Sequence, residues 1–183
     1  MLDKLARFIY FRVFRWSLDG SFPDLDKCVV IVAPHTSWLD FFLGLLLRRV
    51  LGKKFHFVGK KSLFKPPFGW YFRSLGGAPV DRGKSSDTVS AIASLFKERK
   101  EFRLALAPEG TRKKVERWKS GYYYIAHTAA VPIVMVAFDY GKKQVKISKP
   151  QITSGDYHTD RIAYEHFFKG VIGRVPHYSF TLI

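Results

Sequence analysis

Cysteine is almost absent from the sequence. Cys28 is the single cysteine among 183 residues, so an internal disulfide and a multi-thiolate metal site are both excluded. So little cysteine suits a protein of a reducing compartment such as the cytosol. The histidines show no His-Glu-x-x-His or comparable spacing, and the sequence therefore predicts no metal site.

Acidic residues are also scarce. Asp and Glu number 15 against 31 Lys and Arg, a formal net charge of +16, which favours a partner that carries phosphate or carboxylate groups. Because 47% of the residues are hydrophobic and 16% are aromatic, a disordered basic tail is excluded. The length is sufficient for one domain with a buried core and too short for two ordinary domains.

No apolar run is long enough to span a bilayer. Arginines interrupt the N-terminal stretch and no small-residue cleavage site follows it, so we expect neither a membrane span nor a cleaved signal. At about 100° per residue, one helical face would carry Leu2, Leu5, Ala6, Ile9, Val13 and Trp16. Phenylalanines lie among the cations, a pattern typical of the lipid headgroup layer. We therefore expect residues 1–20 to form an amphipathic helix at the membrane interface. A helix docked on the core with a solvated basic face is the alternative.

Beyond residue 20, short β-branched or aromatic runs alternate with longer helical periods. The pattern predicts strands at 28–33, 55–58, 79–82, 102–107 and 133–138, and a strand pair within 145–152. It predicts helices at 37–51, 70–73, 85–96, 122–130 and 160–172. We therefore expect residues 21–183 to form one α/β domain, with a mostly parallel or mixed sheet flanked by helices.

The segment His-Thr-Ser-Trp-Leu-Asp, residues 35–40, follows the first of these strands. Open α/β sheets hold their functional groups at the carboxyl ends of strands. If a helix begins just after His35, the Asp40 carboxylate folds back beneath the imidazole and stabilises its protonated form. The segment thus predicts a general base oriented by an acid. The alternative is a loop histidine followed by an acid that the helix dipole favours.

A second polar segment, Ala-Pro-Glu-Gly-Thr-Arg-Lys-Lys, follows the strand at 102–107. Gly110 would let the backbone approach a ligand closely, and Arg112 offers paired donors to a phosphate. Glu109 would accept from a hydroxyl or orient Arg112. A solvated surface turn is the alternative. Arg82 has the same two interpretations, as a phosphate clamp or as a member of an ordinary ion pair.

Several other chemistries have no sequence support. There is no Gly-x-Ser-x-Gly nucleophile elbow, and Cys28 lies inside a predicted strand, so covalent nucleophilic catalysis is not indicated. Gly77 and Gly83 are separated by five residues rather than the four of a P-loop, which argues against a nucleotide site.

Taken in order, these segments resemble the motif blocks of the glycerolipid acyltransferase family. The matching blocks are 35–40, Lys61 with 77–82, 108–112 and 131–134. Their ordered occurrence across roughly residues 28–138 is far more specific than any one block. The sequence departs from the family at Pro34, where many relatives have Asn, and at Ala107, which stands in place of Phe.

The resemblance implies that His35 takes a proton from a lysolipid hydroxyl as that hydroxyl attacks an acyl thioester, with Asp40 orienting His35. It implies that the polar head of the acceptor is held by Lys61, Arg82, Glu109, Gly110, Thr111 and Arg112. The donor would be acyl-CoA or acyl carrier protein, and the acceptor a lysophospholipid, first of all 1-acylglycerol-3-phosphate. No metal and no cofactor beyond the donor are implied.

We therefore expect a phospholipid-synthesising enzyme that is peripheral or monotopic on the cytoplasmic face of the cell membrane. Its positive charge fits an anionic leaflet, a phosphorylated acceptor and an acidic donor. One alternative is acyl transfer to another lysolipid, such as an aminoacyl lipid, whose carboxylate would then bind Arg82 and Arg112. A more distant alternative is a non-catalytic basic module that binds membrane or nucleic acid. We expect no nucleic-acid partner, because no such motif is recognisable and residues 35–40 would be left unexplained.

Overall fold

A mixed β-sheet organises the chain in the computed structural model, which describes residues 2–80 and 85–180. The sheet has seven strands in the order β1-β7-β6-β2-β5-β3-β4, and every neighbouring pair is parallel except β6 and β7. The strands are β1 (Ser17–Asp19), β2 (Lys27–Ala33), β3 (His56–Lys60), β4 (Gly77–Val80), β5 (Phe102–Leu106), β6 (Ile133–Asp139) and β7 (Gln144–Ile147). The prediction of a single α/β domain with a mostly parallel or mixed sheet is confirmed.

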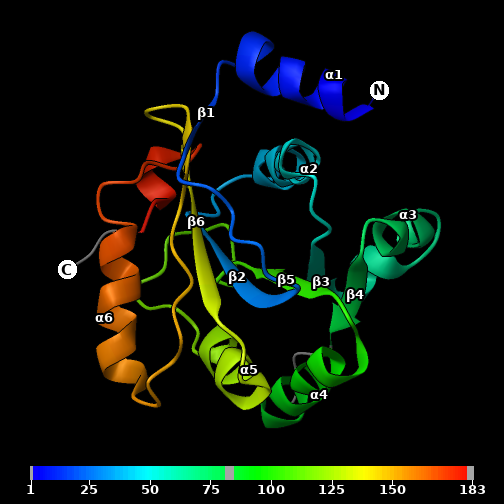
Figure 1. Ribbon diagram of the computed structural model, residues 1–183, viewed down its shortest axis with the longest axis vertical. Coiled ribbons are helices and arrows are strands. Elements are labelled where there is room, and N and C mark those ends of the chain that lie inside the picture. The colour runs from blue at the N-terminus through cyan, green and yellow to red at the C-terminus, as the bar shows by residue number, and fades with distance from the viewer. Residues whose placement is uncertain (1, 81–84, 181–183) are drawn as a thin grey trace.

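Helices cover both faces of this sheet, with α2 above it and α4, α5 and α6 around the opposite face (Figure 1). The α-helices are α1 (Leu2–Phe8), α2 (Leu39–Leu51), α3 (Gly69–Ser74), α4 (Ser85–Glu98), α5 (Gly121–Ala129) and α6 (Tyr157–Phe167). A π-helical turn, η1 (Ile9–Val13), continues α1, and two short 3₁₀ turns are η2 (Lys61–Phe64) and η3 (Pro176–Tyr178).

The core consists of two apolar layers, one on each face of the sheet. Because successive strand residues point to opposite faces, Val29 and Ile31 of β2 belong to the layer beneath α4 and α5. Cys28 and Val30 of the same strand pack in the layer beneath α2. Burial on both faces explains why β2 reads as a continuous apolar run in the sequence.

The parallel register brings several loops to one edge of the sheet. Ile31 of β2 lies opposite Leu106 of β5, and Ala33 of β2 lies opposite Ala137 of β6. Parallel strands end at the same edge, so the segments that follow β2, β5 and β6 emerge side by side there. Open α/β sheets place their binding sites at this edge.

Two predicted elements differ in the C-terminal part of the chain. The predicted strand pair within 145–152 is wrong: β7 ends at Ile147, and Gln151 makes only an isolated bridge to Ile133. Pro150 lacks the N–H that a continuing strand would use. The helix predicted at 160–172 is instead α6, which begins earlier because the Asp156 side chain caps Tyr157–Phe167 at its start.

The N-terminal helix also differs from its predicted form. It is α-helical only to Phe8, and the following π-helical turn, which has more residues per turn, rotates later side chains away from the predicted face. The buried side chains of this segment are Ala6, Tyr10 and Trp16, whereas Leu2, Leu5 and Val13 are exposed. The continuous apolar face predicted for residues 2–16 is therefore wrong. Within residues 2–80 and 85–180, no helix has the length and apolarity needed to cross a membrane.

Trp16→Ala should lower the free energy of unfolding by about 3–5 kcal/mol, because the indole is buried against Tyr10 and Tyr140 and its removal leaves a cavity. Phe14→Ala is the matched control: that ring is 49% exposed, and we expect a change within about 0.5 kcal/mol. Urea denaturation of the two variants gives the comparison. If the two substitutions lowered the free energy of unfolding equally, the docking of this segment through Trp16 would be contradicted.

Candidate active site

His35 and Asp40 face each other at the carboxyl edge of the sheet, in the turn that connects β2 to α2. His35 Nδ1 lies 3.1 Å from Asp40 Oδ2, and the imidazole is 28% exposed while the carboxylate is buried. A carboxylate at Nδ1 fixes the tautomer in which Nε2 is unprotonated. Nε2 is therefore the ring nitrogen that is suited to accept a proton from a bound molecule.

Both oxygens of the buried Asp40 carboxylate accept hydrogen bonds. Its Oδ2 accepts the backbone N–H of Thr36 at 2.9 Å and of Ser37 at 2.8 Å, in addition to its contact with His35. Its Oδ1 accepts the hydroxyl of Tyr140 at 2.8 Å. Several donors at one carboxylate offset the cost of burying a charge, so Asp40 holds the turn and the imidazole in one arrangement.

Tyr140 is a functional candidate that the sequence motifs did not single out. It follows β6, the neighbour of β2, and so reaches the same edge of the sheet as His35. Burial, together with the hydrogen bond to Asp40, raises the pKa of the Tyr140 hydroxyl, which stays protonated as a donor. Its ring packs edge-on against Trp16, with 5.0 Å between the ring centroids, so the N-terminal segment supports the Tyr140 side chain. The only available signal was the position of Tyr140 directly after an apolar strand.

Glu109 also contacts His35, through the backbone. The side chain is buried after β5, and its Oε2 accepts the His35 N–H at 2.8 Å. Its Oε1 is buried without a hydrogen-bond partner among the described residues. Burial raises the pKa of the Glu109 carboxyl to about 7, although the hydrogen bond from His35 opposes the shift. The adjacency of β2 and β5 creates this contact, which the sequence did not predict.

The other predicted binding residues lie in more exposed positions. Gly110 has φ +63°, a backbone conformation that favours glycine. Thr111 and Arg112 are exposed in the loop after β5. Lys61 is exposed at the start of η2, directly after β3. Arg82 lies outside the described residues.

Comparison with known proteins shows the family of the chain. A family model described as Acyltransferase matches residues 20–139. The chain belongs to the acyltransferase family. It is 29% identical over 133 residues to a 1-acyl-sn-glycerol-3-phosphate acyltransferase of Streptococcus pneumoniae. The matched region covers 67% of this chain and 49% of that protein. It is 32% identical over 132 residues to the human 1-acyl-sn-glycerol-3-phosphate acyltransferase beta. This second matched region covers 69% of this chain and 46% of the human protein.

The predicted resemblance to glycerolipid acyltransferases is thus confirmed, and the chain spans about half the length of the curated relatives it matches. The matched region contains His35, Asp40, Glu109 and Arg112. It ends one residue before Tyr140, the donor to Asp40. The family region alone therefore lacks one of the hydrogen bonds that hold the site.

A C-terminal segment of the chain also packs against the turn at His35. The Val175 N–H donates to Thr36 Oγ1 at 3.1 Å, and the Tyr140 N–H donates to the Ile172 carbonyl at 2.8 Å. A Cβ at Gly173 would lie 2.7 Å from Thr36 Oγ1, so only glycine permits this approach. Residues 172–175, which carried no recognisable motif, thus support both sides of the Asp40 carboxylate.

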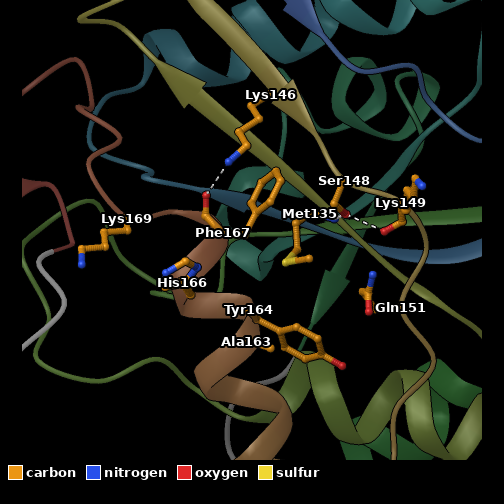
Figure 2. Close-up of a pocket in the computed structure, with 10 residues that line it drawn as sticks. All are labelled: Met135, Lys146, Ser148, Lys149, Gln151, Ala163, Tyr164, His166, Phe167 and Lys169. Carbon is orange, nitrogen blue, oxygen red and sulfur yellow. Dashed lines mark hydrogen bonds between the residues drawn. The ribbon is translucent and has the colours of Figure 1, made fainter.

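A cavity of about 660 Å³ lies apart from this site, between the sheet and α6 (Figure 2). Met135 and Tyr164 contribute to its wall, with Lys146, Lys149 and Lys169 among the lining residues. None of the described site residues predicted from the sequence lines it.

In the part of the chain that the structure describes, no cluster of His, Cys, Asp and Glu could hold a metal ion.

Glu109→Gln should reduce the pH dependence of stability between about pH 4.5 and 7. Because burial raises the pKa of Glu109 to about 7, the folded chain binds this proton more tightly than the unfolded chain does, and the free energy of unfolding falls as the pH rises through this window. The expected contribution is about 3 kcal/mol, and the glutamine variant lacks it. Urea denaturation at pH 5 and pH 7.5 measures the difference. If the free energy of unfolding fell equally in both proteins between pH 5 and pH 7.5, burial would not raise the pKa of Glu109.

Proposed function

We propose that this chain transfers a fatty acyl group from a thioester donor, acyl-CoA or acyl carrier protein, to the hydroxyl of a lysophospholipid. The acceptor we favour is 1-acylglycerol-3-phosphate, after which both relatives are named. The observation that carries the proposal is the pair of His35 and Asp40, with 3.1 Å between imidazole and carboxylate. A partly exposed imidazole backed by a buried carboxylate suits general-base chemistry.

In the proposed reaction, His35 Nε2 removes the proton of the acceptor hydroxyl while the hydroxyl oxygen attacks the thioester carbonyl carbon. A carbon–oxygen bond forms, and the tetrahedral intermediate collapses with cleavage of the carbon–sulfur bond. The imidazolium then returns its proton to the departing thiolate. Asp40 stabilises the imidazolium and keeps it oriented, as carboxylates do in other acid–base pairs. The acceptor attacks directly, so no covalent intermediate with the protein is required.

Several residues around this pair would bind the acceptor. Arg112 is exposed in the loop after β5, and its planar guanidinium can form paired hydrogen bonds with a phosphate. We assign Thr111, Lys61 and Arg82 to the same polar head, with the backbone at Gly110 in close approach. We assign Glu109 a supporting role, because its buried carboxyl accepts from the His35 N–H.

The acceptor and its product are lipids, so we also propose that the protein works as a peripheral or monotopic protein on the cytoplasmic face of the cell membrane. The charge of +16 supports attraction to an anionic leaflet. The N-terminal segment contributes exposed apolar side chains, with Leu5, Phe8 and Val13 each more than half exposed. Such residues beside arginines suit the headgroup layer.

The decisive experiment measures thiol release from acyl-CoA and from acyl carrier protein with a panel of lysolipids. We expect turnover with 1-acylglycerol-3-phosphate, and a loss of about 10²- to 10⁴-fold in His35→Ala, because a positioned base contributes that much to rate. His158→Ala, an exposed histidine of α6, is the matched control and should retain full activity. Undiminished turnover in a folded His35→Ala variant would refute the mechanism. Preference for an aminoacyl lysolipid would reassign the acceptor.

Tyr140→Phe should lower kcat about ten-fold with little change in KM for the acceptor. The substitution removes the 2.8 Å hydrogen bond to Asp40 Oδ1 and leaves the ring in place, so the base is less well oriented while the binding residues are untouched. Tyr124→Phe, an exposed tyrosine of α5, is the control. A rise in KM at constant kcat would instead place Tyr140 in acceptor binding.

A further inference from the structure

Large apolar side chains of the α2 start, η2 and α3 are exposed on the surface instead of filling the core. We call this group the aromatic surface; it comprises Trp38, Phe42, Leu63, Phe68, Trp70 and Tyr71. Trp70 is 72% exposed and Phe68 is 67% exposed. Aromatic rings of this size are normally largely buried, and a group of exposed ones marks a surface that contacts something else.

Ring-to-ring contacts join the two halves of the aromatic surface. Trp38 packs on Phe42 at 5.3 Å, and Phe42 packs on Phe41 at 5.7 Å, both at the start of α2. Phe41 reaches Phe72 of α3 at 5.9 Å. The contacts therefore form one continuous path from the helix that carries Asp40 to α3.

At the α3 end, the path continues to the most exposed ring. Phe72 contacts Tyr71 at 5.7 Å, and Tyr71 contacts Trp70 at 6.1 Å. The surface begins at Trp38, inside the segment that holds both His35 and Asp40, so it borders the site directly.

The stretch of sequence that carries η2, α3 and most of α2 has charges of one sign. The sequence has no acidic residue between Asp40 and Asp81. The same stretch carries exposed cations directly beside the rings: Lys60, Lys61, Lys65 and Arg73. Exposed aromatic rings among cations match the boundary layer of an anionic bilayer, where rings enter the acyl region and cations meet phosphates.

We propose that the aromatic surface of α2, η2 and α3 inserts into the boundary layer of an anionic phospholipid membrane and presents the His35 site to that layer. The contact is separate from the one expected of the N-terminal helix, because it involves other elements. It rests on the proposed function in one respect: a lysolipid acceptor would reach His35 along the membrane without passing through water.

The test measures binding to vesicles that contain both phosphatidylglycerol and phosphatidylcholine, and it compares the unchanged protein with variants. We expect the full chain to co-sediment with them, and Phe68→Ala/Trp70→Ala to lower the partition coefficient by about ten-fold or more, since two exposed rings no longer enter the lipid. The matched control is Ile152→Ala/Ile162→Ala, which removes two equally exposed apolar side chains around α6 and should bind like the unchanged protein.

Two results would overturn the proposal. One is undiminished vesicle binding by Phe68→Ala/Trp70→Ala. The other is self-association in analytical ultracentrifugation that this variant abolishes while its vesicle binding stays intact, which would make the surface an interface between copies of the chain.

Turnover separates this proposal from the proposed function. Phe68→Ala/Trp70→Ala should use a water-soluble short-chain lysolipid at the normal rate, and the same acceptor class embedded in vesicles at a reduced rate. If the unchanged protein used no acceptor at all, the proposed function would fail. The vesicle-binding result would still decide the role of the aromatic surface.

Discussion

The buried Asp40 carboxylate is the constraint on which the site depends. A charge removed from water needs compensating hydrogen bonds, and Asp40 obtains them from the Thr36 and Ser37 backbone, from Tyr140 and from His35. These donors come from the turn after β2 and from the residue after β6. The parallel register of those two strands brings the donors together, so the sheet and the charge support one another.

Glu109 contacts the same histidine but has fewer hydrogen bonds. Asp40 is buried among several donors, whereas Glu109 has one bond from His35 and a second oxygen without a partner among the described residues. Burial raises the pKa of Glu109 to about 7, and its one hydrogen bond from His35 only partly opposes that shift. Two carboxyl groups that contact His35 thus have different roles: Asp40 faces the ring, and Glu109 holds the backbone that carries it.

How far the sequence predicted this molecule depended on the range of each interaction. The pairing of His35 with Asp40 was predictable, because a strand, a turn and a helix start are local patterns. The contact of Glu109 with His35 was not, since it needs β5 to lie beside β2, and residue patterning does not specify strand order. Tyr140 was missed for the same reason. The N-terminal helix was predicted, but its buried face was not, because the π-helical turn breaks the regular period.

The hydrogen bonds of residues 172–175 have a consequence for the order in which the protein becomes competent during synthesis. His35 and Asp40 leave the ribosome early. Thr36, which lies between them in the sequence, accepts a hydrogen bond from the Val175 N–H, and the Tyr140 N–H donates to the Ile172 carbonyl. A nascent chain that ends at residue 139 would contain the whole family match and still lack these contacts. The site is therefore completed only when residues 172–175 fold back onto it, and a chain interrupted before them would leave the histidine–aspartate pair without its full support.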